Sequence, residues 1–219
     1  MKEEINFKEM AAQLRKPNGE DAIKTGEMMS KGNLHMIHET LKVLDAKAND
    51  NILEIGMGNG FYVNEIFGKS DSINYTGCDY SEFMVQESEK LNSTWIAKGK
   101  ATFIQSNITS LPFESNIFNK IFTVNTLYFW DNEIDALSEI KRVIRQDGKF
   151  IIAFRPIHQT EKYPFTKYGF NQFSKKDVEE LLLANGFSII DIFENKEPPF
   201  EMNGLIMETE NIVVVAQKA

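Results

Sequence analysis

The sequence predicts an α/β fold in which a doubly wound, mostly parallel sheet carries helices on both of its faces. An apolar run at residues 52–55 leads into a glycine-rich turn at 56–60, and apolar residues at helical spacing follow at 62–67. Strand and helix patterns then alternate along the rest of the chain. The 219 residues, 42% of them hydrophobic, are enough to bury one sizeable core, and no linker or repeat divides them.

The turn after the first predicted strand is typical of a ligand-binding loop. Gly56, Gly58 and Gly60 allow the backbone to turn sharply where side chains would block a ligand. The next helix presents its N-terminus to the same place, which favours a nucleotide-type ligand. A dinucleotide fingerprint requires a third glycine where this chain has Phe61, so an NAD-dependent oxidoreductase on a similar sheet is a less favoured alternative.

An acid precedes these glycines and gives the pattern Glu54-x-Gly56-x-Gly58-x-Gly60. The pattern resembles the first motif of the class I S-adenosylmethionine (SAM) dependent methyltransferases, in particular small-molecule members of methyltransferase types 11 and 25. The resemblance implies a Rossmann-like, seven-stranded sheet with an antiparallel last strand. It also implies SAM as the cofactor and S-adenosylhomocysteine (SAH) as the product, bound by these four residues and Met57.

A second acid, Asp79, ends a predicted strand about twenty residues after the glycine turn. The segment Asp79-Tyr80-Ser81-x-x-Met84 resembles the next motif of the same family. The resemblance implies that Asp79 binds the ribose hydroxyls and that Tyr80 and Met84 lie near the adenine. The alternative interpretation is that Asp79 and Ser81 only cap a helix, because Asp and Ser are favoured at that position.

Two asparagines end the next two predicted strands. Asn107 and Ile108 resemble the adenine-reading segment of the family, which usually has Asp where this chain has Asn107; the alternative is an ordinary turn residue. Asn125 ends the strand at 119–124 and is predicted to face the reactive methyl group of the cofactor. The Thr-Leu-Tyr sequence at 126–128 replaces the Pro-Pro-aromatic run of the DNA and protein amino-methyltransferases, which argues against that subgroup.

The following segments supply more of the alternation that the sheet requires. Asp131 is predicted to cap a helix with apolar residues from Ile134 to Ile144. A turn at Gln146-Asp-Gly148 then leads into a strand at 149–155.

The C-terminal part predicts one more helix and two strands. The Ser-x-x-Asp pattern at 174–177 is typical of a capping box, and the helix that it opens stops at Gly186. Residues 187–194 and 211–217 predict the two final strands, and two prolines and Gly204 indicate a loop between them.

Composition and charge exclude several classes of function. The net charge of −8 and the pI near 5.1 disfavour a nucleic-acid partner. No apolar run is long enough to span a bilayer and the N-terminus lacks a signal-peptide core, so we expect a cytoplasmic protein. Cys78 is the only cysteine, which excludes a disulfide within the chain and the thiol set of arsenite methyltransferases. His35, His38 and His158 show no metal-ligand spacing, so no metal is predicted.

Two regions outside the motifs are predicted to select the substrate. Residues 1–34 form an expected amino-terminal lid, in which Pro17 and Gly26 help to separate short helices, and residues 35–219 form the methyltransferase domain. Arg15 is predicted to pair with the carboxylate of the cofactor or with an acidic substrate, the alternative being a solvated surface arginine. The aromatic-rich connection at 156–173 is predicted to form a pocket wall, the alternative being core packing.

The predicted function is direct, in-line transfer of a methyl group from SAM to a small-molecule acceptor. Where the acceptor must lose a proton, Tyr128, His158 and Tyr168 are the candidate catalytic bases. The alternative function is a non-catalytic SAM- or SAH-binding protein that regulates or binds a partner.

Overall fold

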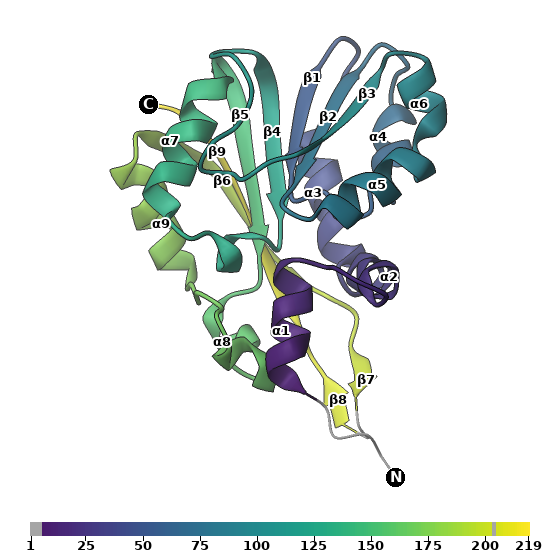
Figure 1. Cartoon of the computed structure of the whole chain (residues 1–219). Coiled ribbons are helices and arrows are strands. Elements are labelled where there is room, and N and C mark those ends of the chain that lie inside the picture. Colours follow the sequence, from purple (N-terminus) through teal and green to yellow (C-terminus); the bar gives the residue numbers. More distant parts are fainter. Residues whose placement is uncertain (1–5, 203–204) are drawn as a thin grey trace.

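The structure is a computed structural model that describes residues 6–202 and 205–219 (Figure 1). Within these residues the chain forms a seven-stranded sheet in the order β3-β2-β1-β4-β5-β9-β6, and β9 runs antiparallel to both of its neighbours. The predicted sheet with an antiparallel last strand is therefore confirmed. Its strands are β1 Asn51–Ile55, β2 Asn74–Asp79, β3 Ala101–Gln105, β4 Phe118–Val124, β5 Ile144–Phe154, β6 Phe187–Lys196 and β9 Glu210–Lys218.

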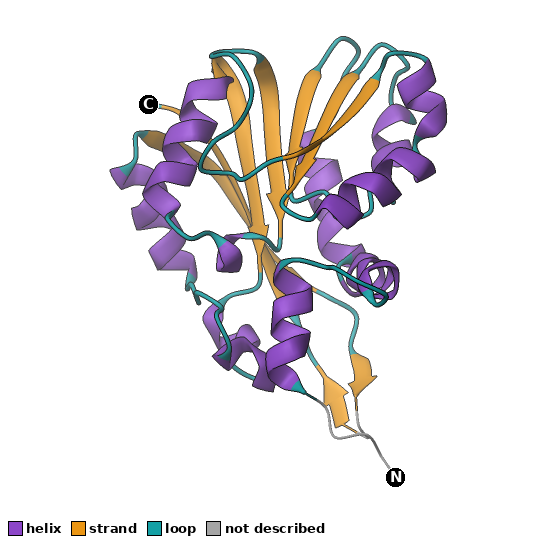
Figure 2. Ribbon diagram, viewed as in Figure 1, coloured by secondary structure: helices purple, strands orange, loops and turns teal. Residues whose placement is uncertain are grey.

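Helices cover both faces of this sheet, as Figure 2 shows. The helices α3 and α4 pack on one face through side chains such as Met36 and Ile66, and α7 and α9 pack on the other through Leu137 and Leu182. The helices are α1 Phe7–Arg15, α2 Ala22–Gly32, α3 Leu34–Leu44, α4 Val63–Phe67, α5 Glu82–Leu91, α6 Ser93–Ala97, α7 Glu133–Val143, α8 Ile157–Thr160 and α9 Lys175–Ala184, with 3₁₀ turns η1 Leu127–Phe129 and η2 Pro164–Lys167.

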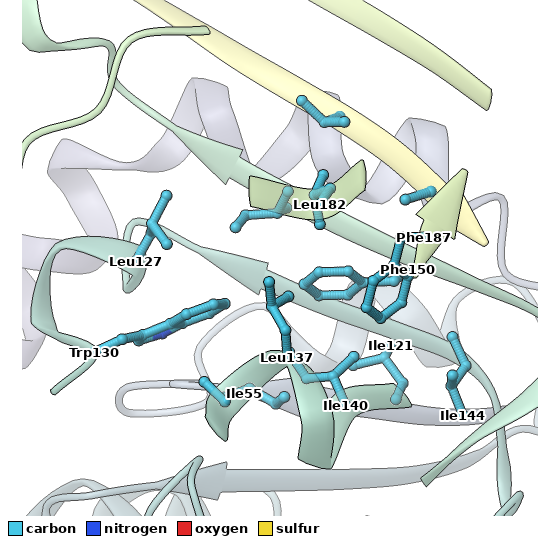
Figure 3. Packing of buried hydrophobic residues seen from close by; sticks show 14 of the residues in the cluster. Ile55, Ile121, Leu127, Trp130, Leu137, Ile140, Ile144, Phe150, Leu182 and Phe187 are labelled. Carbon is cyan, nitrogen blue, oxygen red and sulfur yellow. The ribbon is translucent and has the colours of Figure 1, made fainter. Parts of the chain in front are cut away.

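The central strands are buried on both faces. In β4, Ile121 points into the cluster beneath α7 and α9, and its neighbour Phe122 points into the opposite cluster. Figure 3 shows Ile121 with Phe150 of β5 and Ile140 of α7, all of them fully buried. Each such side chain stabilises the fold by about 1.5–3 kcal/mol. This packing holds the parallel strands β1, β2 and β4 in place, so that their carboxyl ends lie together at one edge of the sheet.

The amino-terminal helices lie at this carboxyl edge (Figure 1). The predicted break at Gly26 is wrong, because Gly26 lies inside α2. A Cβ atom there would lie 3.1 Å from the Cε and Sδ atoms of Met84, so glycine allows α2 to approach α5 closely. The division of the chain at residues 1–34 and 35–219 stays a prediction, although α3 does begin at Leu34.

The start and the end of α7 differ from the prediction. Its N-cap is Asn132, whose side chain accepts hydrogen bonds from the N–H groups of Ile134 and Asp135, and Asp131 is one residue too early to do so. Ile144 was expected in the helix but begins β5, and the predicted turn at 146–148 lies within that strand. The register against β4 shifts there, so these residues bulge from the ladder.

The segment between β6 and β9 also differs from the predicted loop. It contains a two-stranded sheet of β7 Phe200–Met202 and β8 Leu205–Met207. The two prolines at 198–199 lie in the connection before β7, and Gly204 lies outside the described residues. The predicted capping box of α9 is confirmed, because Ser174 and Asp177 exchange both of its hydrogen bonds.

Candidate active site

A cavity opens at the carboxyl edge of the sheet, between the glycine turn after β1 and the amino-terminal helices. The register aligns Ile55 with Cys78 of β2 and with Thr123 of β4, so the residues that follow these positions meet at one place. Ten of the eleven predicted cofactor-binding residues line the cavity: Glu54, Gly56, Met57, Gly58, Gly60, Asp79, Tyr80, Asn107, Ile108 and Asn125. The exception is Met84, which is fully buried beneath α2.

The three glycines of the turn have different roles. All adopt positive φ angles, of 74°, 58° and 65° for Gly56, Gly58 and Gly60, which favours glycine at each position. A Cβ atom on Gly56 would lie 2.3 Å from Cγ2 of Thr126, and one on Gly60 would lie 2.9 Å from Nδ2 of Asn92. A Cβ atom on Gly58 would meet no atom of residues 6–202 or 205–219 within 4 Å. Gly56 and Gly60 are therefore required by packing, and Gly58 leaves open space for a ligand.

The carboxylate of Asp79 is held by backbone N–H groups of the glycine turn and of the residue that caps α5. Its Oδ2 accepts from the N–H of Gly58 at 3.0 Å, and its Oδ1 accepts from the N–H of Ser81 at 2.8 Å. Loss of hydration raises the pKa of Asp79 to about 6, although these hydrogen bonds oppose the shift. The carboxylate is ionised at neutral pH and keeps lone pairs for ligand hydroxyls. Ser81 is the N-cap of α5, so the capping interpretation is right for Ser81.

Glu54 places a second carboxyl group on the same wall. The hydroxyl of Tyr75 donates to its Oε2 at 2.6 Å. Loss of hydration raises the pKa of Glu54 to about 7; the Tyr75 hydrogen bond opposes this shift, and the negative charge of Asp79 adds to it. Two acids on one wall suit a ligand that is cationic or rich in hydroxyl donors.

Asn107 both forms a turn and lines the cavity. Its Oδ1 accepts from the N–H of Thr109 at 3.1 Å, and its backbone carbonyl accepts from Ser110 at 2.9 Å. The interpretation of Asn107 as a turn residue is thus correct, but it does not account for the position of Asn107 in the cavity wall. An amide oxygen has two lone pairs, so Asn107 keeps the capacity to accept one more hydrogen bond from a ligand.

Asn125 is held in place by long-range contacts. It ends β4 with a φ of 60°, and its Nδ2 donates to Oδ1 of Asn33 at 2.7 Å. The hydroxyl of Tyr128 donates to its Oδ1 at 2.9 Å. Asn33 also accepts from Nη1 of Arg155 at 3.2 Å. The sequence analysis missed Asn33 and Arg155, since no local pattern indicates that they meet Asn125.

The three candidate bases do not line the cavity. Tyr128 is buried, its hydroxyl is bonded to Asn125 and to the backbone of Arg155, and burial raises its pKa. His158 pairs with Glu210, with 57% of its side chain exposed. Tyr168 is 48% exposed, and it too lies away from the cavity. None of the three therefore faces the cavity in this structure, and their role as bases stays a prediction.

The aromatic connection at 156–173 lies behind the wall instead of forming it. Phe170 packs edge to face on Phe129 with ring centroids 4.6 Å apart, and Phe129 is the residue that lines the cavity. Packing against the core is thus the better description of Phe170. The connection also contains η2, against which α1 packs, so the two regions predicted to select the substrate touch each other.

The amino-terminal segment contributes Leu14, Arg15, Pro17 and Met29 to the cavity wall. Arg15 forms an ion pair with Asp131, which also lines the cavity. The sequence analysis assigned Asp131 to helix capping and so missed this position.

The described residues favour neither a metal site nor a nucleophilic cysteine. In the described ranges, no three His, Cys, Asp or Glu side chains converge in a way that suits a metal ion. Burial raises the pKa of the Cys78 thiol, which disfavours a thiolate nucleophile. No helix among residues 6–202 and 205–219 is long and apolar enough to cross a membrane.

Comparison with known proteins identifies the family. The sequence profile of the family described as "Methyltransferase domain" matches residues 53–152, from β1 into β5. An uncharacterized methyltransferase of Bacillus subtilis, YdaC, is 26% identical over 174 residues, which are 79% of this chain and 91% of that protein. These similarities assign the chain as a SAM-dependent methyltransferase. SAM is therefore its cofactor, and the open space at Gly58 beside the Asp79 carboxylate fits it.

Further relatives agree with this assignment. The O-methyltransferase resE of Aspergillus sclerotiorum is 25% identical over 182 residues, 78% of this methyltransferase and 69% of that protein. The structure of a SAM-dependent methyltransferase from Aquifex aeolicus shares the fold, with a TM-score of 0.67, 18% identity and coverage of 97% and 98% of the two chains. A putative methyltransferase of Haloferax volcanii, solved in complex with the Trm112 activator, gives a TM-score of 0.77 at 14% identity, with 98% of both chains covered.

Proposed function

We propose that this enzyme transfers a methyl group from SAM to a small-molecule acceptor that enters the cavity at the carboxyl edge. The observation that carries the proposal is the cover over the cavity, where Leu14, Pro17 and Met29 of the amino-terminal segment complete its wall. Such cavities favour ligands that bury most of their surface. The net charge of −8 also disfavours a nucleic-acid acceptor. The cytoplasm stays the proposed location.

When bound, SAM supplies an electrophilic methyl group on a positively charged sulfur. The residues of the chain then bind and orient the reactants. Asp79 accepts hydrogen bonds from ribose hydroxyls, and Gly58 provides room for the nucleoside. Asn125, fixed by Asn33 and Tyr128, orients its amide at the end of β4. The amino-terminal helices exclude water, so positioning supplies most of the rate enhancement.

The experiment is a methyl-transfer assay with labelled SAM and two fractions of a cell extract. One fraction holds metabolites that pass a small-pore filter, and the other holds protein and nucleic acid. We expect label in the metabolite fraction, and its loss in Asp79→Asn. Label only in the macromolecular fraction would contradict the proposal. Binding of SAH without label in either fraction would favour the non-catalytic alternative.

A further inference from the structure

The part of the cavity wall that comes from α1, α2 and the segment from η1 to α7 has a chemistry of its own. We call it the acceptor end and define it by Leu14, Arg15, Met29, Phe129 and Asp131. Three of these side chains are apolar and two form the ion pair. Among the described residues that line the cavity, Arg15 is the only cationic side chain, while Glu54 and Asp79 lie at the ends of β1 and β2. The acceptor end thus combines an apolar surface with a single positive charge.

The ion pair at this end is exchangeable. The Arg15 side chain is 35% exposed and that of Asp131 is 63% exposed, so water screens their attraction. Asp131 is not required by the adjacent helix, because Asn132 caps α7. In the part of the chain that the structure describes, the guanidinium of Arg15 makes no hydrogen bond other than the one to Asp131. Its remaining N–H donors match the two oxygens of a carboxylate.

The acceptor end itself offers no free base to an acceptor. Tyr128, His158 and Tyr168 lie elsewhere, and no described histidine or lysine lines the cavity. Asp131 is paired with Arg15, and the carboxyl groups of Glu54 and Asp79 belong to β1 and β2, not to the acceptor end. An acceptor that is already ionised needs no base, because it has no proton to lose.

We propose that the acceptor is a small anion with an apolar or aromatic body, whose carboxylate or ionised hydroxyl replaces Asp131 on Arg15. This inference rests on the proposed function. An oxygen lone pair of the anion forms the new C–O bond as the C–S bond breaks and its electron pair goes to sulfur. The products are SAH and a neutral ester or ether, and no proton remains to be placed. Leu14, Met29 and Phe129 contact the apolar body.

The test measures binding by calorimetry, with protein saturated with SAH and three probes of similar shape: benzoate, benzamide and benzylamine. We expect benzoate to bind about tenfold more tightly than benzamide, because hydrogen bonds to a charged group are the stronger ones. Arg15→Gln removes this preference and leaves SAH affinity unchanged. Asp131→Asn strengthens benzoate binding, because it frees Arg15. Lys176→Gln, an exposed cation on α9, serves as the charge-matched control and changes nothing.

The outcomes separate the inference from the proposed function. SAH binding without a preference for benzoate, or with a preference for benzylamine, overturns the anionic acceptor and leaves the methyltransferase intact. A loss of SAH affinity in Arg15→Gln also overturns it, because Arg15 then belongs to the cofactor. Failure of the unaltered protein to bind SAH refutes the proposed function itself.

Discussion

The two ends of the cavity are built in different ways. The cofactor end comes from short segments, the turn at 56–60 and the strand end at Asp79, each of which follows a buried strand directly. The acceptor end depends on contacts between distant parts of the chain, such as the ion pair of Arg15 with Asp131. Local sequence therefore specifies the residues at the ends of β1 and β2, and the proposed acceptor end depends on how the amino-terminal helices pack on the sheet.

The largest expected effect concerns Arg155, which follows β5 and donates to the backbone carbonyl of Gly32 at the end of α2. Glu197 is buried and pairs with Arg155 at 2.7 Å, while Asn211 donates to its other oxygen at 2.9 Å. Among the described residues, Nε of Arg155 already has no hydrogen-bond partner. Glu197→Ala leaves the buried guanidinium unpaired, which lowers the free energy of unfolding by about 3–5 kcal/mol. Urea denaturation measures the loss.

The matched control is Glu194→Ala on β6, the strand that ends just before Glu197. Glu194 pairs with Lys175, and both side chains are exposed, so its removal costs at most about 1 kcal/mol. Equal destabilisation by the two variants would show that the Arg155 contact does not anchor the end of α2 to the sheet.

The second prediction distinguishes two effects of replacing a glycine at the cofactor end: loss of space for the ligand and strain in the backbone. Gly58→Ala places a methyl group in the open space of the cavity and lowers SAH affinity by about tenfold or more. Gly99→Ala is the control, because its φ of 66° and its free surroundings match those of Gly58 far from the cavity. Both lose about 1–2 kcal/mol of stability from strain. Similar SAH affinities in the two variants would contradict a ligand site at Gly58.

The third prediction concerns pH at the cofactor end. Asp79 has a pKa raised to about 6, so its carboxylate is protonated as the pH falls through that value. A protonated carboxyl group accepts hydrogen bonds less well, and SAH affinity should therefore drop between about pH 7.5 and about pH 5. Calorimetry across this range measures the drop, and Asp79→Asn should show a flatter profile. A pH-independent affinity in the unaltered protein would contradict the role of Asp79.

The ligand-free protein should respond to pH in the opposite direction. The folded-state pKa values of Asp79 and Glu54 lie above their ordinary values, at about 6 and about 7. Their contribution to the free energy of unfolding is fully present below the unfolded-state values and is lost as the pH rises through the folded-state values. Asp79→Asn should remove the contribution of Asp79 to this pH dependence of the free energy of unfolding. Urea denaturation of both proteins at several pH values would measure it.

The smallest effect distinguishes two adjacent residues. Asn132→Ala removes the cap of α7 and costs about 1 kcal/mol of stability. Asp131→Ala breaks only an exposed ion pair and costs less than about 0.5 kcal/mol. Thermal denaturation of both variants makes the comparison. A larger loss in Asp131→Ala would restore the original prediction that Asp131 caps the helix.

The sequence predicted the fold and most of the residues that line the cavity at the ends of β1 and β2, because their signals are local. The apolar run before the glycines and the spacing to Asp79 each belong to one strand and one turn. Met84 was predicted to lie near the adenine, but α2 packs over it at Gly26. The sequence of α5 does not predict this contact, because the contact depends on a helix from a distant part of the chain.

The acceptor end was harder to predict because single-residue shifts decide which side chain reaches it. In the 3₁₀ turn η1, Phe129 lines the cavity while Tyr128 points to Asn125 and Arg155. One residue also separates Asp131 at the cavity from Asn132 at the helix cap. Element boundaries are the least certain part of a sequence-based prediction, and these assignments depend on them.

The most direct test of the central claim is calorimetric titration with SAH of the unaltered protein and of Asp79→Asn, with NAD as the control ligand. We predict that SAH binds, that NAD does not, and that Asp79→Asn weakens SAH binding by about tenfold or more, because the amide offers one weaker acceptor oxygen in place of two charged ones. Equal SAH affinity of the two proteins, or binding of NAD in place of SAH, would contradict the cofactor site described at the carboxyl edge of β1 and β2.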